Sequence, residues 1–205
     1  AIDLSWKSSQ IEGNTYTLRQ TESLFKEGKH TKGNTKAEAV MLLNHQAALD
    51  YVLNKPDYFR ELTVQKILEI HRFLTKGLGI PNKIRAGRVG ITGTNYKPLA
   101  KANQIQKALQ DLCDLINSKR NVLEKAFIAL LLIAYIQPFE DGNKRTARII
   151  CNALLLPNKY CPISFRTVEP EDYRYATLLF YEQNSIPSFK KIFMEQLEFS
   201  TANYF

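Results

Sequence analysis

Residues 122–148 read VLEKAFIALLLIAYIQPFEDGNKRTAR, and their pattern predicts the centre of the fold. Its first part, Val122 to Ile136, is apolar nearly all round, which a helix on the protein surface could not be. We therefore expect a helix that runs through the middle of a bundle. Pro138 ends that helix, and Gly142 permits a sharp turn before a second helix from about Asn143 to Leu156.

The rest of the chain largely follows the helical period. Thr17 begins one expected helix, with Gln20 three residues on as a capping box, and Thr63 precedes another whose apolar positions fall within residues 64–74. Further helices are expected over residues 36–53, 105–116, 169–183 and 187–199. The sequence thus predicts a mainly α fold, a helical bundle.

One segment departs from this pattern. Between Ile84 and Leu99 the sequence IRAGRVGITGTNYKPL alternates at Val89 and Ile91 before a turn that contains Gly93. This pattern predicts one short, exposed β-hairpin. No repeat, low-complexity tract or linker divides the chain, so residues 1–205 are expected to form a single domain.

Composition excludes several classes of protein. With 205 residues, 44% hydrophobic and 23% charged, the chain can bury a globular core. Its longest apolar run, residues 126–136, is far short of the ~20 residues that span a bilayer, so no membrane partner is expected. The three cysteines are widely spaced and the three histidines complete no zinc pattern, which favours reduced thiols in a cytoplasm. The first residue is Ala1 and no secretory signal follows, so we expect part of a longer chain.

The net charge of +8 suits polyanionic partners or nucleotide phosphates. We interpret the lysines and arginines as spread along the chain rather than gathered in blocks, so nucleic acid is not an expected partner.

The turn after the first helix has the chemistry of an anion site. The backbone N–H groups that follow Gly142 belong to the open first turn of a helix, which binds phosphate well. Arg145 and Arg148, three residues apart, share one face of that helix, and Lys144 adds a third cation. Asp141 could be a Mg²⁺ ligand beside phosphate oxygens. Each residue alone is more often a cap or a solvated charge, but their combination within eight residues predicts a site.

The sequence QPFEDGNKRTAR resembles the HPFxDGN[G/K]RxxR motif of Fic (Fido) domain proteins. Members of this family typically transfer AMP from Mg·ATP to a hydroxyl of a target protein. The resemblance implies that Phe139 anchors the loop in the core and that Asp141 holds Mg²⁺. It implies further that the backbone of residues 142–144 and the Asn143 side chain cradle phosphates, and that Arg145 and Arg148 take the outer phosphates.

The motif departs from the family at its first residue. The family has a histidine there, which takes the proton from the attacking hydroxyl, whereas this chain has Gln137. A carboxamide has no basic nitrogen near neutral pH, so it can position a hydroxyl but not deprotonate it. None of His30, His45 and His71 lies in a matching motif. We therefore expect impaired or absent catalysis with retained nucleotide binding, whether Gln137 is natural or introduced.

Two further segments resemble parts of the same family. SSQIEGN, from Ser8 to Asn14, is similar to its inhibitory motif at the end of a short helix of about residues 1–14. The resemblance implies that Glu12 pairs with Arg148 and blocks productive binding of the nucleotide. ITGTNYKP is similar to the family's substrate flap, in which backbone edges hold a target segment. The expected flap residues are Gly90, Ile91, Thr92, Gly93 and Thr94.

Three functions stay open from the sequence. The first is a protein adenylyltransferase, autoinhibited through Glu12, whose partners are a nucleotide and a protein with a Ser, Thr or Tyr hydroxyl. The second is a non-catalytic nucleotide-binding or regulatory module. The third is phosphoryl transfer, since Lys144 in place of the more usual glycine is similar to a kinase-like branch of the family. Of the tyrosines at 173, 175 and 181, one could stack on adenine, although packing is the more common role; a homo-oligomer is compatible with all three functions.

Overall fold

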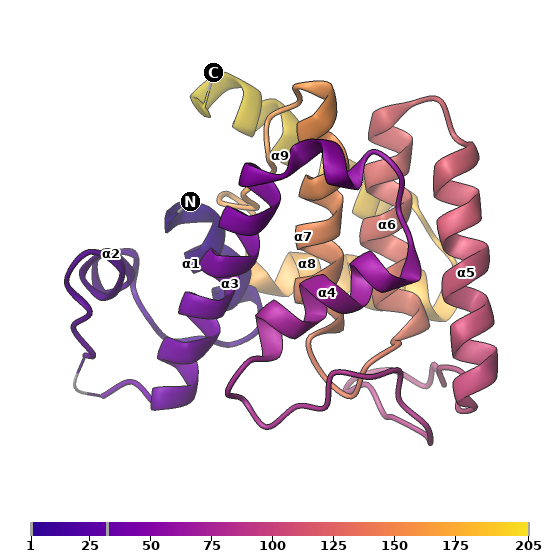
Figure 1. Cartoon of the computed structure of the whole chain (residues 1–205), viewed down its shortest axis with the longest axis horizontal. Coiled ribbons are helices and arrows are strands. Elements are labelled where there is room, and N and C mark those ends of the chain that lie inside the picture. Colours follow the sequence, from indigo (N-terminus) through magenta and orange to yellow (C-terminus); the bar gives the residue numbers. More distant parts are fainter. Residues whose placement is uncertain (1, 32, 205) are drawn as a thin grey trace.

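The computed structural model describes residues 2–31 and 33–204. Within these ranges the chain forms nine α-helices and two short 3-10 turns, without any β-strand (Figure 1). The α-helices are α1 (Ile2–Ile11), α2 (Leu18–Glu27), α3 (Lys36–Asn54), α4 (Val64–Thr75), α5 (Ala102–Ser118), α6 (Val122–Ile136), α7 (Asn143–Leu155), α8 (Pro170–Gln183) and α9 (Pro187–Tyr204). The 3-10 turns are η1 (Pro56–Phe59) and η2 (Leu156–Asn158). The prediction of a mainly α fold is confirmed.

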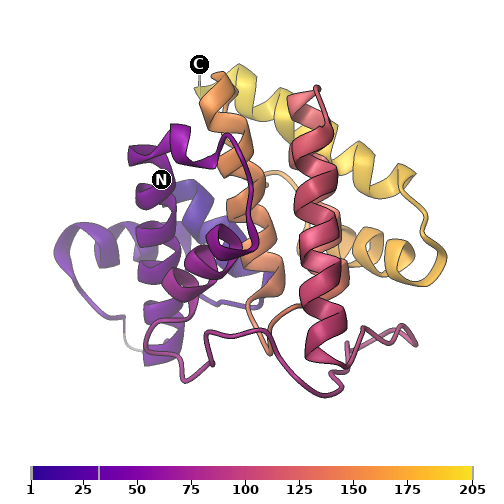
Figure 2. The same cartoon turned by 45° about the vertical axis from the view of Figure 1, so that its right-hand side comes forward.

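Helices α6 and α7 lie side by side in the middle of the bundle (Figures 1 and 2). Helix α5 packs against α6, and α3 and α4 pack against α7. Every residue of α7 except Lys144 is buried, although α7 is much less apolar than α6. The segment expected to be central is therefore only one half of the centre. Because the second half carries Arg145 and Arg148, the fold places two guanidinium groups inside the protein.

Side chains close the open first turns of several helices. The hydroxyl of Thr17 accepts a hydrogen bond from Gln20 N, and the Gln20 side chain accepts one from Thr17 N, as the sequence predicts. Thr35 and Glu38 form a second capping box, at the start of α3. Helix α7 begins without a side-chain cap, as α5 and α8 also do. Its first turn is left open for another acceptor.

Helix α1 is a docked element of the bundle. It packs against α3 and also reaches α7 and α8, with Leu4 in the core. The indole Nε1 of Trp6 donates to Tyr16 O at 2.8 Å, which fixes the chain after the helix. Ser5 Oγ lies 3.2 Å from Nδ1 of the buried His45 on α3. These contacts hold the end of α1 over α7.

The prediction of a β-hairpin over residues 84–99 is wrong: the segment is an irregular loop. A two-stranded hairpin without a third strand is marginally stable, and here other partners take its polar groups. Gly87 N donates to Ala100 O at 2.8 Å, but Asn95 N donates to the Glu182 carboxylate at 2.7 Å instead of to a facing strand. Pro98 has no N–H to contribute.

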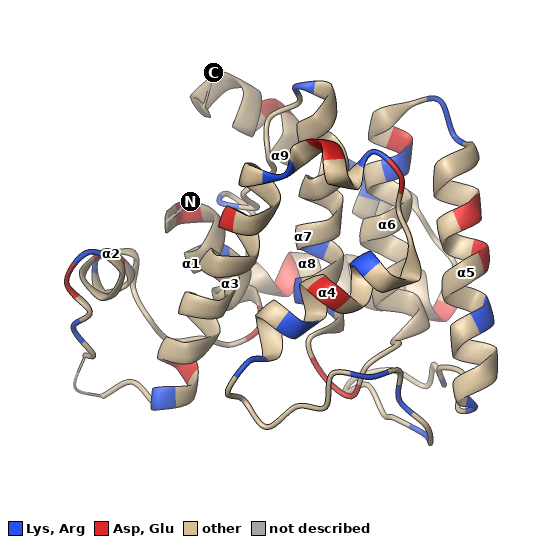
Figure 3. Ribbon diagram, viewed as in Figure 1, with Lys and Arg blue, Asp and Glu red and all other residues tan. Residues whose placement is uncertain are grey.

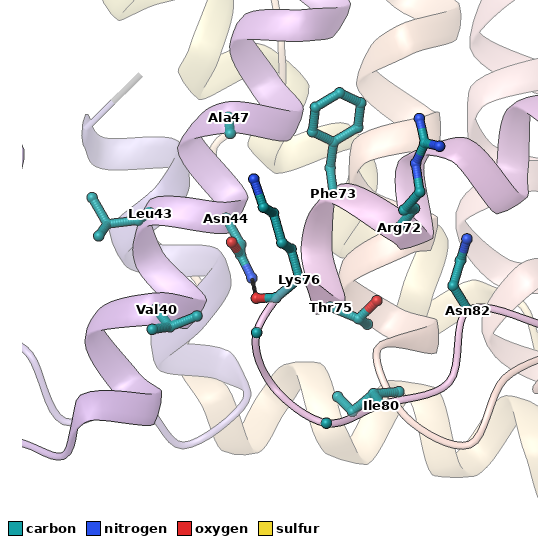
Figure 4. A pocket seen from close by; sticks show the side chains of 12 residues that line it. Val40, Leu43, Asn44, Ala47, Arg72, Phe73, Thr75, Lys76, Ile80 and Asn82 are labelled. Carbon is teal, nitrogen blue, oxygen red and sulfur yellow. Dashed lines mark hydrogen bonds between the residues drawn. The ribbon is translucent and has the colours of Figure 1, made fainter.

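A large hollow of ≈ 1040 Å³ lies between α3, α4 and the loop after α4 (Figure 4). The amide of Asn44 spans this hollow and donates to the carbonyl of Lys76 at 2.7 Å. The expected site residues lie elsewhere, in a smaller hollow of ≈ 380 Å³. The volume of a hollow therefore does not identify the functional site. The site is identified by the chemistry of the residues that line it.

Among the described helices, none is both long enough and apolar enough to cross a membrane. The three cysteines are buried and free. Burial raises the pKa of the Cys113 thiol to about 12, so this thiol stays protonated at neutral pH.

The buried side chain of His45 leads us to predict that the folded protein loses stability in acid. Burial, and then the charges of Arg148 and Arg145, lower its pKa to about 3. Between pH 6.5 and about 3 the unfolded chain therefore binds a proton at His45 that the folded chain does not, and stability falls as the pH falls. We expect a loss of about 1.4 kcal/mol per pH unit from this group. Denaturant unfolding of the wild type and His45→Gln across this range measures it, and equal slopes for the two proteins would contradict the prediction.

Candidate anion-binding site

The turn between α6 and α7 is shaped by two residues in the left-handed backbone region. Gln137 ends α6 with φ 51°, and Gly142 precedes α7 with φ 82°. The buried guanidinium of Arg85 fastens this turn from the neighbouring loop, because its Nε donates to Gln137 O at 2.6 Å. Arg85 N also donates to Pro138 O at 3.0 Å. The turn is therefore held from outside as well as by its own sequence.

Asn143 and Phe139 hold the inside of the turn. The Phe139 ring is fully buried. Asn143 Oδ1 accepts from Phe139 N at 2.9 Å, while its Nδ2 donates to Phe139 O at 2.9 Å and to Gln137 Oε1 at 3.0 Å. The amide of Asn143, expected to cradle phosphate, thus makes its hydrogen bonds within the turn. What Asn143 leaves for an anion is its backbone N–H.

His71 on α4 packs against the turn and supports it. This role of His71 was not predicted from the sequence. Its ring stacks on Phe139 with centroids 3.7 Å apart and an interplanar angle of 14°. Nε2 lies 3.0 Å from the carbonyl of Asp141, which can only accept, so Nε2 carries the proton. Nδ1 lies 3.0 Å from Oδ1 of Asn82, which stands at the edge of the hollow in Figure 4. Because a neutral ring with its proton on Nε2 can only accept at Nδ1, the Asn82 amide is assigned with its N–H2 group toward the ring. Burial lowers the pKa of His71, so its ring is neutral near pH 7.

The start of α7 presents donors without acceptors. Its first intrahelical bond is Thr146 N to Gly142 O, so the N–H groups of residues 143–145 precede the helical ladder. In the described part of the chain, Nη1 of Arg145 and Nη1 of Arg148 are buried without a hydrogen-bond partner. Buried donors of this kind are costly unless an acceptor completes them. Their clustering at a helix N-terminus suits an anion with several oxygens.

Asp141 stands at the mouth of this site with its side chain 65% exposed. Its Oδ1 accepts from Gly142 N at 2.6 Å and its Oδ2 from Arg145 at 3.1 Å, which fixes the carboxylate at the edge of the pocket. No group of three or more His, Cys, Asp or Glu in the described residues could hold a metal alone. One carboxylate beside phosphate oxygens and water is how proteins commonly hold Mg²⁺, so this arrangement fits that ion when a nucleotide is present.

The N-terminal helix delivers an internal anion to the same place. Glu12, one residue beyond the end of α1, accepts from Arg148 Nη2 at 2.9 Å. Arg148 also donates through Nε to Ser8 Oγ at 2.8 Å and through Nη2 to Ser8 O at 2.9 Å. The second carboxylate oxygen of Glu12 lies 4.0 Å from Lys144 Nζ. The structure thus brings Ser8 and Glu12 together with Lys144 and Arg148, more than 130 residues further along the chain.

The charge balance keeps Glu12 ionised. Burial favours its neutral form, but the charges of Arg148 and Lys144 and the hydrogen bond from Arg148 outweigh this effect and lower the pKa of Glu12. The contact is therefore at full strength above the ordinary carboxyl pKa and is lost only as the pH falls through the lowered value. At physiological pH a competing anion, rather than a proton, must displace Glu12.

Gln137 lines the same pocket, but its side chain is engaged. Its Nε2 donates to Ala134 O at 2.6 Å, and its Oε1 accepts from Asn143. Tyr181 OH also donates to Ala134 O, at 2.8 Å. Tyr181 is buried, as is Tyr173, whose ring lies 5.5 Å from the Arg148 guanidinium carbon; Tyr175 is 65% exposed. The tyrosines at 173 and 181 therefore pack in the interior.

The loop expected to be a flap forms the other wall. Gly90, Ile91 and Thr92 line the pocket with Gln137, Asp141 and Lys144. Gly93 lies against α8, where an added Cβ would meet Arg174 at 2.9 Å. Glu182, also on α8, accepts from the Thr94 hydroxyl at 2.5 Å. Arg85, Arg174 and Glu182 escape sequence reasoning because their partners lie more than fifty residues away along the chain.

A sequence model of the Fic/DOC family matches residues 61–155, which contain α4, the whole turn and α7. The chain carries a Fic/DOC family domain. A solved Fic family protein from Desulfovibrio desulfuricans G20 superposes with a TM-score of 0.84 at 25% identity, over 99% of this chain and 63% of that one. A fragment of Fic-1 from Caenorhabditis elegans superposes with a TM-score of 0.86 at 23% identity, over 99% and 62%, and shows the fold alone.

Curated relatives of this Fic/DOC domain carry the name protein adenylyltransferase. One from Nematostella vectensis is 31% identical over 176 residues, which cover 82% of this chain and 40% of the relative. One from Caenorhabditis elegans is 27% identical over 205 residues, covering 95% and 39%. The chain spans about two fifths of the length of these relatives.

The support of the turn by His71 can be tested directly. His71→Phe keeps an aromatic ring against Phe139 but removes the donor to the Asp141 carbonyl. The loss of one hydrogen bond of about 1 kcal/mol should weaken Mg·ATP binding about fivefold, measured by calorimetry. His30→Phe, on an exposed position, is the control. Unchanged affinity in His71→Phe would show that Asn143 and Arg85 suffice to hold the turn.

Proposed function

We propose that this Fic/DOC domain is a protein adenylyltransferase module that binds Mg·ATP at the start of α7, with AMP transfer to a hydroxyl of a target protein as its reaction. The observation that carries the proposal is the open first turn of α7 beside Arg145 and Arg148, whose Nη1 groups are buried without partners. The names of the curated relatives support the choice of adenylyl transfer over other phosphate chemistry.

Each residue has a role in this proposal. The open backbone N–H groups of residues 143–145 and the guanidinium groups of Arg145 and Arg148 bind the phosphates, whereas Gly142 N already donates to Asp141. Asp141 would hold Mg²⁺ at the pocket mouth, where the ion supplies charge neutralisation between phosphate oxygens. Gly90, Ile91 and Thr92 line the side of the pocket from which a target hydroxyl would approach.

Gln137 restricts the reaction that this domain can catalyse. Transfer needs a base for the hydroxyl proton, and the Gln137 amide has none to offer. In addition, both polar atoms of this side chain make hydrogen bonds within the protein. General-base catalysis is worth about 10² to 10⁴ in rate, so transfer should be slow or absent while nucleotide binding persists. This observation favours the binding-only module as the second candidate function.

Glu12 is proposed to inhibit the domain. Its carboxylate lies 2.9 Å from Arg148, so it occupies the guanidinium edge that an outer phosphate would need. Ser8 strengthens the contact because its hydroxyl and carbonyl orient the same guanidinium. An ATP molecule that meets the paired arginine would bind without its full set of phosphate contacts.

Glu12→Gly should raise ATP affinity and lower the stability of the nucleotide-free protein. The first effect follows from the release of Arg148. The second follows because a guanidinium whose side chain is only 2% exposed loses its counter-charge, although Ser8 still accepts from it. Calorimetry and thermal unfolding, with and without Mg·ATP, measure both, with Glu195→Gly on α9 as the control for an exposed glutamate. An unchanged affinity for ATP in Glu12→Gly would remove the inhibitory role.

Gln137→His combined with Glu12→Gly tests the reaction itself. The double variant should gain transfer activity by about 10² to 10⁴ over Glu12→Gly alone, because it restores a base. Incubation with α-labelled and γ-labelled ATP distinguishes the chemistries through self-labelling. Label from the α position means adenylylation and label from the γ position means phosphorylation. Silence in both assays, together with measurable ATP binding, would leave the binding-only module.

A further inference from the structure

The net charge of the chain comes from one segment. Residues 70–110 contain eight lysines and arginines and no aspartate or glutamate. The remainder of the 28 basic residues therefore equals the 20 acidic ones, and the rest of the chain is neutral. The basic residues are themselves spread along the sequence, and this segment differs from the rest because no acidic residue balances them. The excess is gathered in the end of α4, the loop after it and the start of α5 (Figure 3).

This segment passes along the site. The Arg85 guanidinium already donates to the carbonyl of Gln137 in the turn, as described above. Lys83, Arg88, Lys97 and Lys101 are instead exposed, and none of them lies within 4.0 Å of a carboxylate of the described residues. Unpaired cations in one loop create a positive field that attracts and orients an acidic partner.

A groove of ≈ 580 Å³ runs through the same loop. Arg88 and Lys97 lie along it, and none of the described residues that line it is acidic. Gly90 and Ile91 line both this groove and the pocket that contains Gln137. A segment laid in the groove therefore continues directly into the candidate site.

The backbone of the loop is available for pairing. No N–H from residue 88 to residue 94 donates a hydrogen bond within the described parts of the chain. An extended segment could accept from these groups while its side chains reach the two cations.

Carboxylates on the opposite side limit where acidic residues can lie. Glu140 and Asp141 line the pocket on the side of α7. Glu182 faces the loop, but its carboxylate already accepts from Thr94 Oγ1 and Asn95 N. Acidic side chains of a bound segment are therefore favoured over the groove and disfavoured beside Glu140 and Asp141 at the pocket mouth, so the preference is one-sided.

We propose that this groove binds an extended acidic segment of the target protein, with its acidic side chains on one side of the acceptor hydroxyl against Arg88 and Lys97. This inference rests on the proposed transfer to a protein hydroxyl and names its substrate class. Single-stranded nucleic acid is the competing polyanion, but it binds through exposed aromatic side chains as well as cations. Tyr96, the aromatic residue of the groove, is stacked on Tyr135 and donates its hydroxyl to Tyr135 O.

The test uses two labelled twelve-residue peptides with one central threonine, one with four glutamates on a single side of it and the other with four glutamines there. Fluorescence anisotropy with the full chain should show about fivefold to tenfold tighter binding of the glutamate peptide, and 0.5 M NaCl should abolish the difference. Arg88→Gln with Lys97→Gln should also abolish it. Lys26→Gln with Lys190→Gln, at exposed positions away from the groove, removes the same charge and should leave it unchanged.

Three results would overturn the inference: equal binding of the two peptides, an equal loss in the control double variant, or tighter binding of a twelve-nucleotide oligothymidylate through the same two cations. The inference and the proposed function fail separately. Arg88 and Lys97 do not line the pocket of the turn, so calorimetry should give the same ATP affinity in the Arg88→Gln, Lys97→Gln variant as in the wild type. A chain that prefers the glutamate peptide but does not bind ATP would keep the groove and refute the transferase.

Discussion

The buried guanidinium of Arg148 needs acceptors and a counter-charge, and this requirement shapes the rest of the protein. Arg148 lies on the most enclosed helix of the bundle, with its side chain only 2% exposed, where a charge without a partner would be strongly unfavourable. In the present structure Ser8 and Glu12 bind its Nε and Nη2, while Nη1 keeps no partner, and both residues come from α1 and the turn directly after it. The position of α1 and the occupancy of the anion site are therefore coupled, because both depend on the partners of the Arg148 guanidinium. Whatever anion replaces Glu12 also changes what holds the end of α1.

The turn beside Arg148 is rigid because several independent contacts hold it. Asn143 bonds to both backbone groups of Phe139, His71 stacks on the Phe139 ring and donates to the Asp141 carbonyl, and Arg85 donates to the carbonyl of Gln137. These groups come from three separate elements. Such a turn presents its N–H groups without rearrangement, so binding an anion carries little entropic cost for ordering the turn. In the proposed function, Gln137 impairs the transfer step while these contacts keep the turn in place for the nucleotide.

The surface around the site has two sides with different chemistry. On one side lie Arg145, Arg148 and the open turn of α7, which suit phosphate. On the other side lies an irregular loop whose backbone donors and exposed cations remain free in the described structure. Glu182 and Arg174 of α8 hold the far end of this loop, so it is positioned without being paired as a sheet. A partner segment would supply the pairing that the hairpin prediction assigned to the chain itself.

The helices and the residue types of the turn could be predicted from the sequence alone. Apolar periodicity, the capping residues Thr17 and Thr63, and the breaks at Pro138 and Gly142 act through neighbours a few residues away, so a local pattern is enough to find them. The packed structure was needed to show that α7 lies at the centre, that residues 84–99 form no hairpin, and that His71 and Arg85 support the turn. The contacts of His71, Arg85 and Asn95 join residues more than fifty positions apart, and burial is a property of the packed chain that leaves no periodic trace in the sequence. The Asn143 amide bonds instead to residues four and six positions away, but this choice of partner depends on the folded shape of the turn.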